Sequence, residues 1–168
     1  LYNCLDTGLQ IIKNLLFERL RTQLKLVYGI SVNAVVNSCG ASVQIEVFVN
    51  TESAIKVIKE IMSYLKKYKK EIVPKKHFDS VKTNTRLISR NLSITPETLA
   101  GMFLDQYMNQ IYKPSQNVKS IQDNLNDINN ITIDEIKTLY NEIFLDKHLL
   151  LAYQSNKKLH ISDKDLSI

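Results

Sequence analysis

The chain has 168 residues, of which 44% are hydrophobic and 23% charged, and its formal net charge is +5 at pH 7. This length fits one domain, or one half of something larger, and is sufficient to bury a core. The apolar runs, such as "LLLAY" at 149–153, are much shorter than the roughly 20 residues of a membrane-spanning helix, so the sequence excludes a transmembrane segment and predicts no membrane partner.

The N-terminus, "LYNCLDTGLQ", carries neither an initiator Met nor a signal-peptide pattern. It predicts a fragment or a processed product. Two cysteines, Cys4 and Cys39, are too few for a disulfide scaffold and have no metal-ligand spacing. We interpret both as free thiols, which favours an intracellular compartment, although the sequence does not identify that compartment.

The first predicted element is an amphipathic helix that ends near Lys25 or Leu26. Its apolar residues recur at three- and four-residue spacing: Leu9, Ile12, Leu16, Leu20 and Leu24. The period then changes to two, which is typical of a half-buried strand. One face of this strand is predicted to carry Tyr28, Ile30, Val32, Ala34 and Val36.

A turn, "NSCG" at 37–40, leads to a second alternating segment, Val43 to Val49, so an antiparallel hairpin is the simplest pairing. Thr51 or Ser53 is expected to cap the next helix, which should stop before Pro74. Its predicted apolar residues are Ala54, Ile55, Ile58, Ile61, Met62 and Leu65.

Further helices are predicted along the rest of the chain. One follows Pro74 with Phe78, Val81 and Ile88 inward. Another begins at Thr95-Pro96-Glu97 and ends before Pro114, with an apolar face of Leu99, Met102, Phe103, Tyr107 and Ile111. A short helix near 116–126 and a helix with a capping box at Thr132 to Glu135 come next.

A final strand is predicted from His148 to Tyr153, before a segment from Ser155 that lacks periodicity. The three strands should share one sheet covered by helices, which is an α+β fold with an antiparallel sheet. So few strands again suggest a fragment that lacks N-terminal strands. We therefore expect a domain over residues 1–154 and a tail or linker over 155–168.

The sequence offers no catalytic set of its own. The three histidines, His77, His148 and His160, lack H-x-x-E-H or H-E-x-x-H partners, no G-x-S-x-G elbow occurs, and four glycines form no phosphate-binding loop. We interpret the histidines as surface or boundary residues. No metal ligand is expected in this chain.

A lysine-rich stripe between Lys56 and Lys76 contributes much of the positive charge. Such a stripe can face phosphate or an acidic peptide. No recognition-helix or aromatic-interleaved motif accompanies it. A solvated helix face is therefore favoured over a nucleic-acid interface.

The segment "LFERLRTQLKLVYGISVNAVV" resembles the C-terminal halves of the pitrilysin/insulinase-type zinc peptidases. The matching residues are Leu20, Arg21, Tyr28 and Val32, with the same seven-residue step from Arg to Tyr. The resemblance extends over roughly residues 9–154 and departs from the family at Gly29, where serine is common, and at Thr22-Gln23, where an acidic-basic pair is usual.

The resemblance implies a zinc-free half that faces an H-x-x-E-H half, in the same polypeptide or a separate subunit, with the zinc in that partner. It implies that Arg21 and Tyr28 act on a peptide substrate. A phenol suits the stabilisation of an oxyanion, so Tyr28 is the catalytic candidate as well as a substrate-binding one. A guanidinium fork suits a carbonyl or carboxylate, so Arg21 is the substrate-binding candidate.

Other readings of the same residues stay open. Arg21 can serve as a helix-end cation beside C-terminal carbonyls, and Tyr28 can begin a strand because aromatic residues suit strands. The resemblance also covers relatives that keep the fold as structural subunits of respiratory complexes. A catalytically inactive scaffold subunit is therefore the alternative to a peptidase half.

Overall fold

The computed structural model describes residues 2–37, 40–92, 95–112, 120–162 and 166. It divides into two compact units, the first formed by Leu1–Phe78 with Thr132–Ile168 and the second by Asp79–Ile131. The first unit holds the sheet and both candidate residues.

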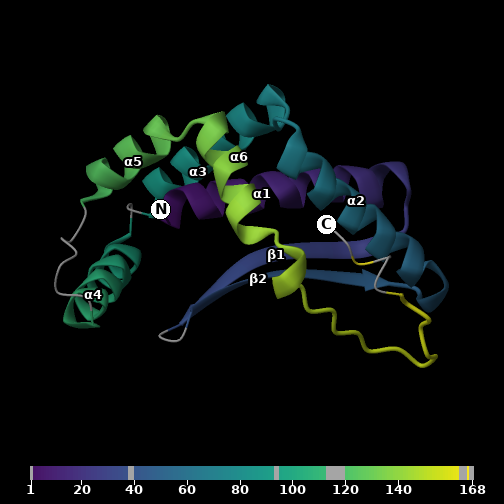
Figure 1. Ribbon diagram of the computed structural model, residues 1–168. Coiled ribbons are helices and arrows are strands. Elements are labelled where there is room, and N and C mark those ends of the chain that lie inside the picture. The colour runs from purple at the N-terminus through teal and green to yellow at the C-terminus, as the bar shows by residue number, and fades with distance from the viewer. Residues whose placement is uncertain (1, 38–39, 93–94, 113–119, 163–165, 167–168) are drawn as a thin grey trace. The chain divides into compact units, whose positions relative to one another are not determined.

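The sheet is the predicted antiparallel hairpin. Strand β1 (Val27–Asn37) pairs with β2 (Gly40–Val49), with Val32 opposite Ile45 and Asn37 opposite Gly40. Figure 1 shows the two strands side by side along their length. Residues 38–39 of the predicted turn lie outside the described residues.

The first helix begins as α1 (Tyr2–Leu16) and continues directly into a π-helical segment, η1 (Phe17–Gln23). It ends where predicted, because Lys25 takes a positive φ of 53° and turns the chain out of the helix. The predicted apolar stripe is confirmed for most of its length, since its first four residues are buried: Leu9, Ile12, Leu16 and Leu20.

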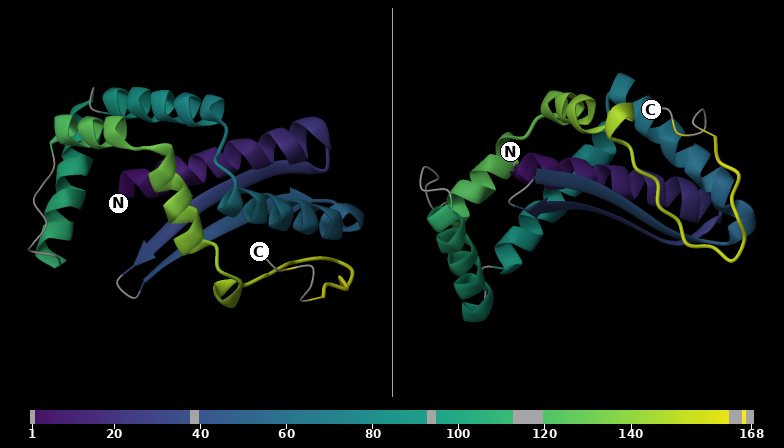
Figure 2. Two further views of the ribbon diagram at one scale, coloured as in Figure 1. Left: turned by 45° about the horizontal axis from the view of Figure 1, so that its top comes forward. Right: turned by 60° about the horizontal axis from the view of Figure 1, so that its bottom comes forward.

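Helices cover one face of the sheet. In Figures 1 and 2, α1 and α6 (Ile133–Ile143) lie on the same side of the hairpin, and Val32 of β1 is buried beneath α1, 1% exposed. The alternate positions of β2 are exposed on the other face: Ser42, Gln44, Glu46 and Phe48. One face of the hairpin thus belongs to the core and the other is open.

Helix α2 (Ala54–Lys70) follows a short 3-10 turn, η2 (Thr51–Ser53). Ser53 is the N-cap residue, as one alternative predicted, but its side chain makes no capping hydrogen bond. The helix ends before Pro74, as expected. The predicted apolar stripe of α2 included Ile58 and omitted Val57. In the structure Val57 is fully buried and Ile58 is only half-buried, so the observed stripe is slightly displaced from the predicted one.

Helix α6 closes the first unit against α1. The predicted capping box is confirmed: the Thr132 side chain accepts from the Glu135 N–H, and the Glu135 side chain accepts from the Thr132 N–H. Tyr140 of α6 is fully buried and donates a hydrogen bond from its hydroxyl to the Gly8 carbonyl of α1 at 2.7 Å. Two segments 132 residues apart in sequence are joined by this bond.

Helix α3 (Lys75–Leu92) leaves the first unit and enters the second, which also contains α4 (Pro96–Tyr112) and α5 (Ile121–Asn130). Pro96 is the first residue of α4, as predicted. Helix α5 begins later than expected, and residues 113–119 lie outside the described residues. The buried apolar residues of this unit include Val81, Leu125, Ile128 and Ile131.

Several residues predicted to face inward in this unit are exposed. Ile88 of α3 is 48% exposed, and Phe103 and Tyr107 of α4 are 51% and 60% exposed. Helical periodicity predicts which side of a helix is apolar but carries no information about what covers that side. The side chains of Met102 and Ile111 lie outside the described residues.

The predicted strand from His148 to Tyr153 is wrong. A 3-10 turn, η3 (Asp146–His148), is followed by irregular chain in which Leu150 is 87% exposed. An apolar run alone does not make a strand, since the N–H and C=O groups of a strand need a neighbouring edge to bond. The sheet among the described residues has two strands, and the α+β class with helices on an antiparallel sheet is confirmed.

Candidate functional site

Arg21 lies in the π-helical segment η1, with an exposed side chain. Its Nη1 donates a hydrogen bond to the Val27 carbonyl at 2.9 Å. The guanidinium is therefore held beside the peptide that joins Val27 to Tyr28. A guanidinium carries five N–H donors, and the Val27 carbonyl is the partner of Arg21 within the described part of the chain.

Tyr28 occupies a β-bulge. Val27 pairs with Val49, and Gly29 pairs with the adjacent residue of β2, Phe48. Strand β1 therefore contains one residue more than β2 at this point, and Tyr28 is that extra residue. The predicted alternation placed Tyr28 on the buried face with Val32, and this is wrong. The bulge shifts the alternation by one residue, so that Val27 is 2% exposed and Tyr28 is 66% exposed.

The Tyr28 hydroxyl donates to Oδ1 of Asn50 at 3.4 Å. Asn50 follows Val49 at the end of β2 and belongs to the alternating set of exposed residues that contains Phe48. The contact thus places the phenol on the open face of the sheet.

Three departures from regular backbone occur within a short segment around the two candidates. They are the π-helical turn that contains Arg21, the positive φ of Lys25 and the bulge at Tyr28. Both π-helical turns and β-bulges occur frequently at functional sites, where they redirect side chains. The fold therefore presents Arg21 and Tyr28 to solvent through local geometry that regular secondary structure does not supply.

The chemistry available at this surface is hydrogen-bond donation. A guanidinium with further N–H groups and a phenol at the open sheet face can bind carbonyl or carboxylate oxygens. Neither group is buried, so the site as described is an open surface.

Sequence reasoning missed Asn50 and the bulge. An isolated glycine within a strand pattern, here Gly29, is a signal for a bulge, and buried Val27 directly before Tyr28 breaks the alternation. Asn50 carried no local signal, because its contact with Tyr28 spans 22 residues.

Within the described part of the chain, the histidines and Cys4 form no alternative site. Among the described residues no group of three or more His, Cys, Asp and Glu side chains is arranged to hold a metal ion. His77 lies 3.4 Å from a Glu18 oxygen, and His148 and His160 are exposed. Burial, followed by the charge of Glu135, raises the pKa of Cys4, the opposite of what an activated thiolate needs; Cys39 lies outside the described residues.

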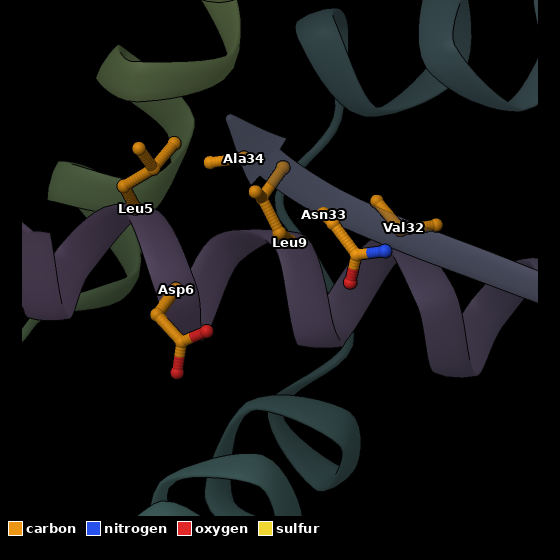
Figure 3. A pocket seen from close by; sticks show the side chains of 6 residues that line it. All are labelled: Leu5, Asp6, Leu9, Val32, Asn33 and Ala34. Carbon is orange, nitrogen blue, oxygen red and sulfur yellow. The ribbon is translucent and has the colours of Figure 1, made fainter. Parts of the chain in front are cut away.

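A pocket of about 140 Å³ lies between α1 and β1, away from the two candidates. Its lining residues are Leu5, Asp6, Leu9, Val32, Asn33 and Ala34. Figure 3 shows the Asp6 carboxylate pointing away from the Leu5 side chain, and burial raises the pKa of this carboxyl group. A space of this size is too small to accept a peptide.

The lysine-rich stripe lies mainly on exposed positions of α2 and the start of α3. Lys67 pairs with Glu71 at 3.7 Å and lies over the Tyr68 ring, 5.5 Å from its centroid. These contacts fit a solvated helix face, and the choice between such a face and a nucleic-acid interface stays a prediction. No described helix is long and apolar enough to cross a bilayer.

About half of the chain matches a known protein family. The family model described as "Peptidase M16 inactive domain" matches residues 1–85. The chain belongs to this family. The matched residues contain Arg21, Tyr28, the hairpin and α2, and the resemblance to the zinc-free half of the pitrilysin/insulinase-type peptidases is confirmed for this M16 domain.

A solved structure supports the fold of the M16 domain beyond the matched residues. The chain is similar to a structure described as a conserved protein from Enterococcus faecalis V583, with a TM-score of 0.69 and 16% sequence identity. The similarity covers 83% of this chain and 32% of that chain, so the M16 domain spans about a third of the longer protein. A search of curated proteins gave no match.

Proposed function

We propose that this M16 domain is the zinc-free half of a metalloendopeptidase and supplies Arg21 and Tyr28 to a partner half that carries H-x-x-E-H. The observation that carries the proposal is the exposure of both side chains by adjacent backbone irregularities inside the family match. The family description as an inactive domain agrees with a half that needs a partner for chemistry.

In this proposal Tyr28 donates its O–H to the oxygen of the peptide carbonyl as negative charge develops there. A donor fixed in this way is worth about 3 kcal/mol in the transition state. Arg21 binds a substrate carbonyl or carboxylate with the N–H groups that do not face Val27. Peptide is the expected substrate class.

The partner half, in the same polypeptide or another subunit, holds the zinc that supplies the attacking hydroxide. The described residues of this chain do not fit a metal site, so they act by binding and orienting the substrate. The open face of the hairpin, which carries Tyr28 and Phe48, is the face we expect to be turned toward that partner.

The proposal is tested by reconstituting the domain with its H-x-x-E-H half and following cleavage of a quenched fluorescent peptide. Tyr28→Phe should lower kcat by about 100-fold with little change in KM, because the donor acts on the transition state. Tyr107→Phe is the matched control, since Tyr107 is 60% exposed and lies on α4.

The isolated domain should bind no stoichiometric zinc and cleave no peptide. Equal activity of the Tyr28→Phe variant and the parent would remove Tyr28 from the mechanism. Zinc-dependent cleavage by the domain alone would overturn the proposal that the zinc lies in the partner half.

A catalytically inactive scaffold subunit is the second candidate. It is favoured by the bond from Arg21 to the Val27 carbonyl, which gives the arginine a structural role that needs no substrate. An H-x-x-E-H motif elsewhere in the same polypeptide would discriminate between the two, because it favours the peptidase. The division into a domain over residues 1–154 and a tail over 155–168 also stays a prediction.

A further inference from the structure

The Tyr28 phenol is held at its far end by Asn50. The carboxamide oxygen of Asn50 accepts from the Tyr28 hydroxyl at 3.4 Å. This distance is long for a hydrogen bond between two oxygens, and catalytic hydrogen bonds are often long before substrate binds. Asn50 therefore contacts the phenol oxygen without burying it.

Asn50 is itself well supported. Its own carbonyl accepts from the Ser53 N–H at 2.9 Å, which starts the 3-10 turn η2. The next residue, Thr51, forms side-chain hydrogen bonds with Ser155 at 3.3 Å and with Asn156 at 3.2 Å. The backbone that carries the acceptor is thus held by contacts that do not involve Tyr28.

The backbone at the other end of the Tyr28 side chain is also held. Arg21 donates to the Val27 carbonyl at 2.9 Å, directly before the bulged residue. One contact fixes the start of the bulge and the other fixes the phenol. A side chain held at both ends loses little additional freedom when it meets a substrate.

We propose that Asn50 is a positioning residue for Tyr28, which rests on the role of Tyr28 in the proposed function. In the free domain the Asn50 oxygen accepts the phenol hydrogen. When the phenol turns its hydrogen to the developing oxyanion, a rotated Asn50 carboxamide donates an N–H to the phenol oxygen. An amide can fill both roles because it carries an acceptor and a donor.

Two variants separate these roles in the reconstituted enzyme. Asn50→Ala removes both acceptor and donor, and kcat should fall about fivefold, the size expected for one neutral hydrogen bond. Asn50→Asp keeps the shape and the acceptor but cannot donate and adds a negative charge, so kcat should fall further. KM should change less than twofold in both variants, because the contact acts through Tyr28 and not on the bound peptide.

The contact is also tested on the domain alone by NMR of the tyrosine rings, with the Tyr28 signals assigned by their loss in Tyr28→Phe. Asn50→Ala should shift the Tyr28 ring signals. Gln44→Ala, at another exposed carboxamide on the open face of β2, should leave them in place.

The two measurements distinguish the failure of this inference from the failure of the proposed function. If the ring signals and kcat of both Asn50 variants match the parent while Tyr28→Phe is impaired, Asn50 has no positioning role and the proposed function stands. If the signals move but Tyr28→Phe is fully active, Asn50 positions a side chain that catalysis does not use, which overturns the inference together with the role of Tyr28.

Discussion

Single residues around the bulge decide which groups reach solvent. Tyr28 is exposed because one extra residue enters β1 between Val27 and Gly29. In a regular strand without the bulge, the phenol of Tyr28 would share the buried face of Val32. The departure from the family pattern at Gly29 lies directly beside it, which raises the question of whether the bulge needs glycine.

The surroundings of Gly29 indicate that it does not. A Cβ at this position would meet nothing within 4 Å, and the φ of Gly29 lies outside the left-handed region. Gly29→Ser should therefore stabilise the chain by about 0.4–1 kcal/mol, because the serine restricts the unfolded chain. Urea unfolding measures this, and a lower midpoint with an unchanged m-value would mean that the bulge depends on the freedom of glycine.

At the scale of elements, α1 and α6 approach each other closely at Gly8, where a larger side chain would be crowded. A Cβ on Gly8 would lie 3.1 Å from Leu139 Cδ2 and 3.3 Å from Tyr140 Cε1. The Tyr140 ring cannot retreat freely, because its hydroxyl is bonded to the Gly8 carbonyl. The two helices are thus fitted to each other at this crossing.

Gly8→Ala should destabilise the chain by about 1 kcal/mol, since overpacking outweighs the gain in helix propensity. Gly101→Ala in α4 is the matched control, because a Cβ there meets nothing within 4 Å. That control should stabilise its helix by up to about 1 kcal/mol. Thermal unfolding measures the stability of both variants. Equal stabilisation by the two alanines would show that Leu139 and Tyr140 move aside to accept the new methyl group.

The elements predicted correctly are those whose signals are local. The capping box at Thr132, the first-turn Pro96 and the change from helical to alternating period each act over a few residues. The strand predicted from His148 is wrong because this apolar run has no partner edge among the described residues. The π-helical turn was not predicted, and the bulge was missed although Gly29 is a local signal for it. The sequence indicated Arg21 and Tyr28 only through family resemblance, and it did not indicate Asn50.

At the scale of the whole molecule, the first unit is built from both ends of the described chain. Residues 1–78 and 132–168 belong to it, and the second unit is inserted between them. Local patterns did not predict this arrangement, because it depends on α6 returning to α1. The hydrogen bond from Tyr140 to Gly8 joins the two ends in the core.

The burial of Tyr140 makes the stability of the first unit depend on pH in the alkaline range. Burial, followed by the charges of Cys4 and Tyr68, raises the pKa of Tyr140 well above its ordinary value of 10.0. Above pH 10 the unfolded chain loses the phenol proton while the folded chain keeps it. The unfolded state then binds fewer protons, so the free energy of unfolding falls as pH rises.

Tyr140→Phe should therefore be less stable than the parent at neutral pH by about 1 kcal/mol, the worth of the lost hydrogen bond. Above pH 10 the difference should shrink by up to about 1.4 kcal/mol per pH unit, because phenylalanine has no proton to lose. Urea unfolding at a series of pH values measures both, with Tyr153→Phe, at an exposed position, as the control. Parallel stability curves for Tyr140→Phe and the parent would mean that the phenol ionises as readily in the folded chain as in the unfolded one.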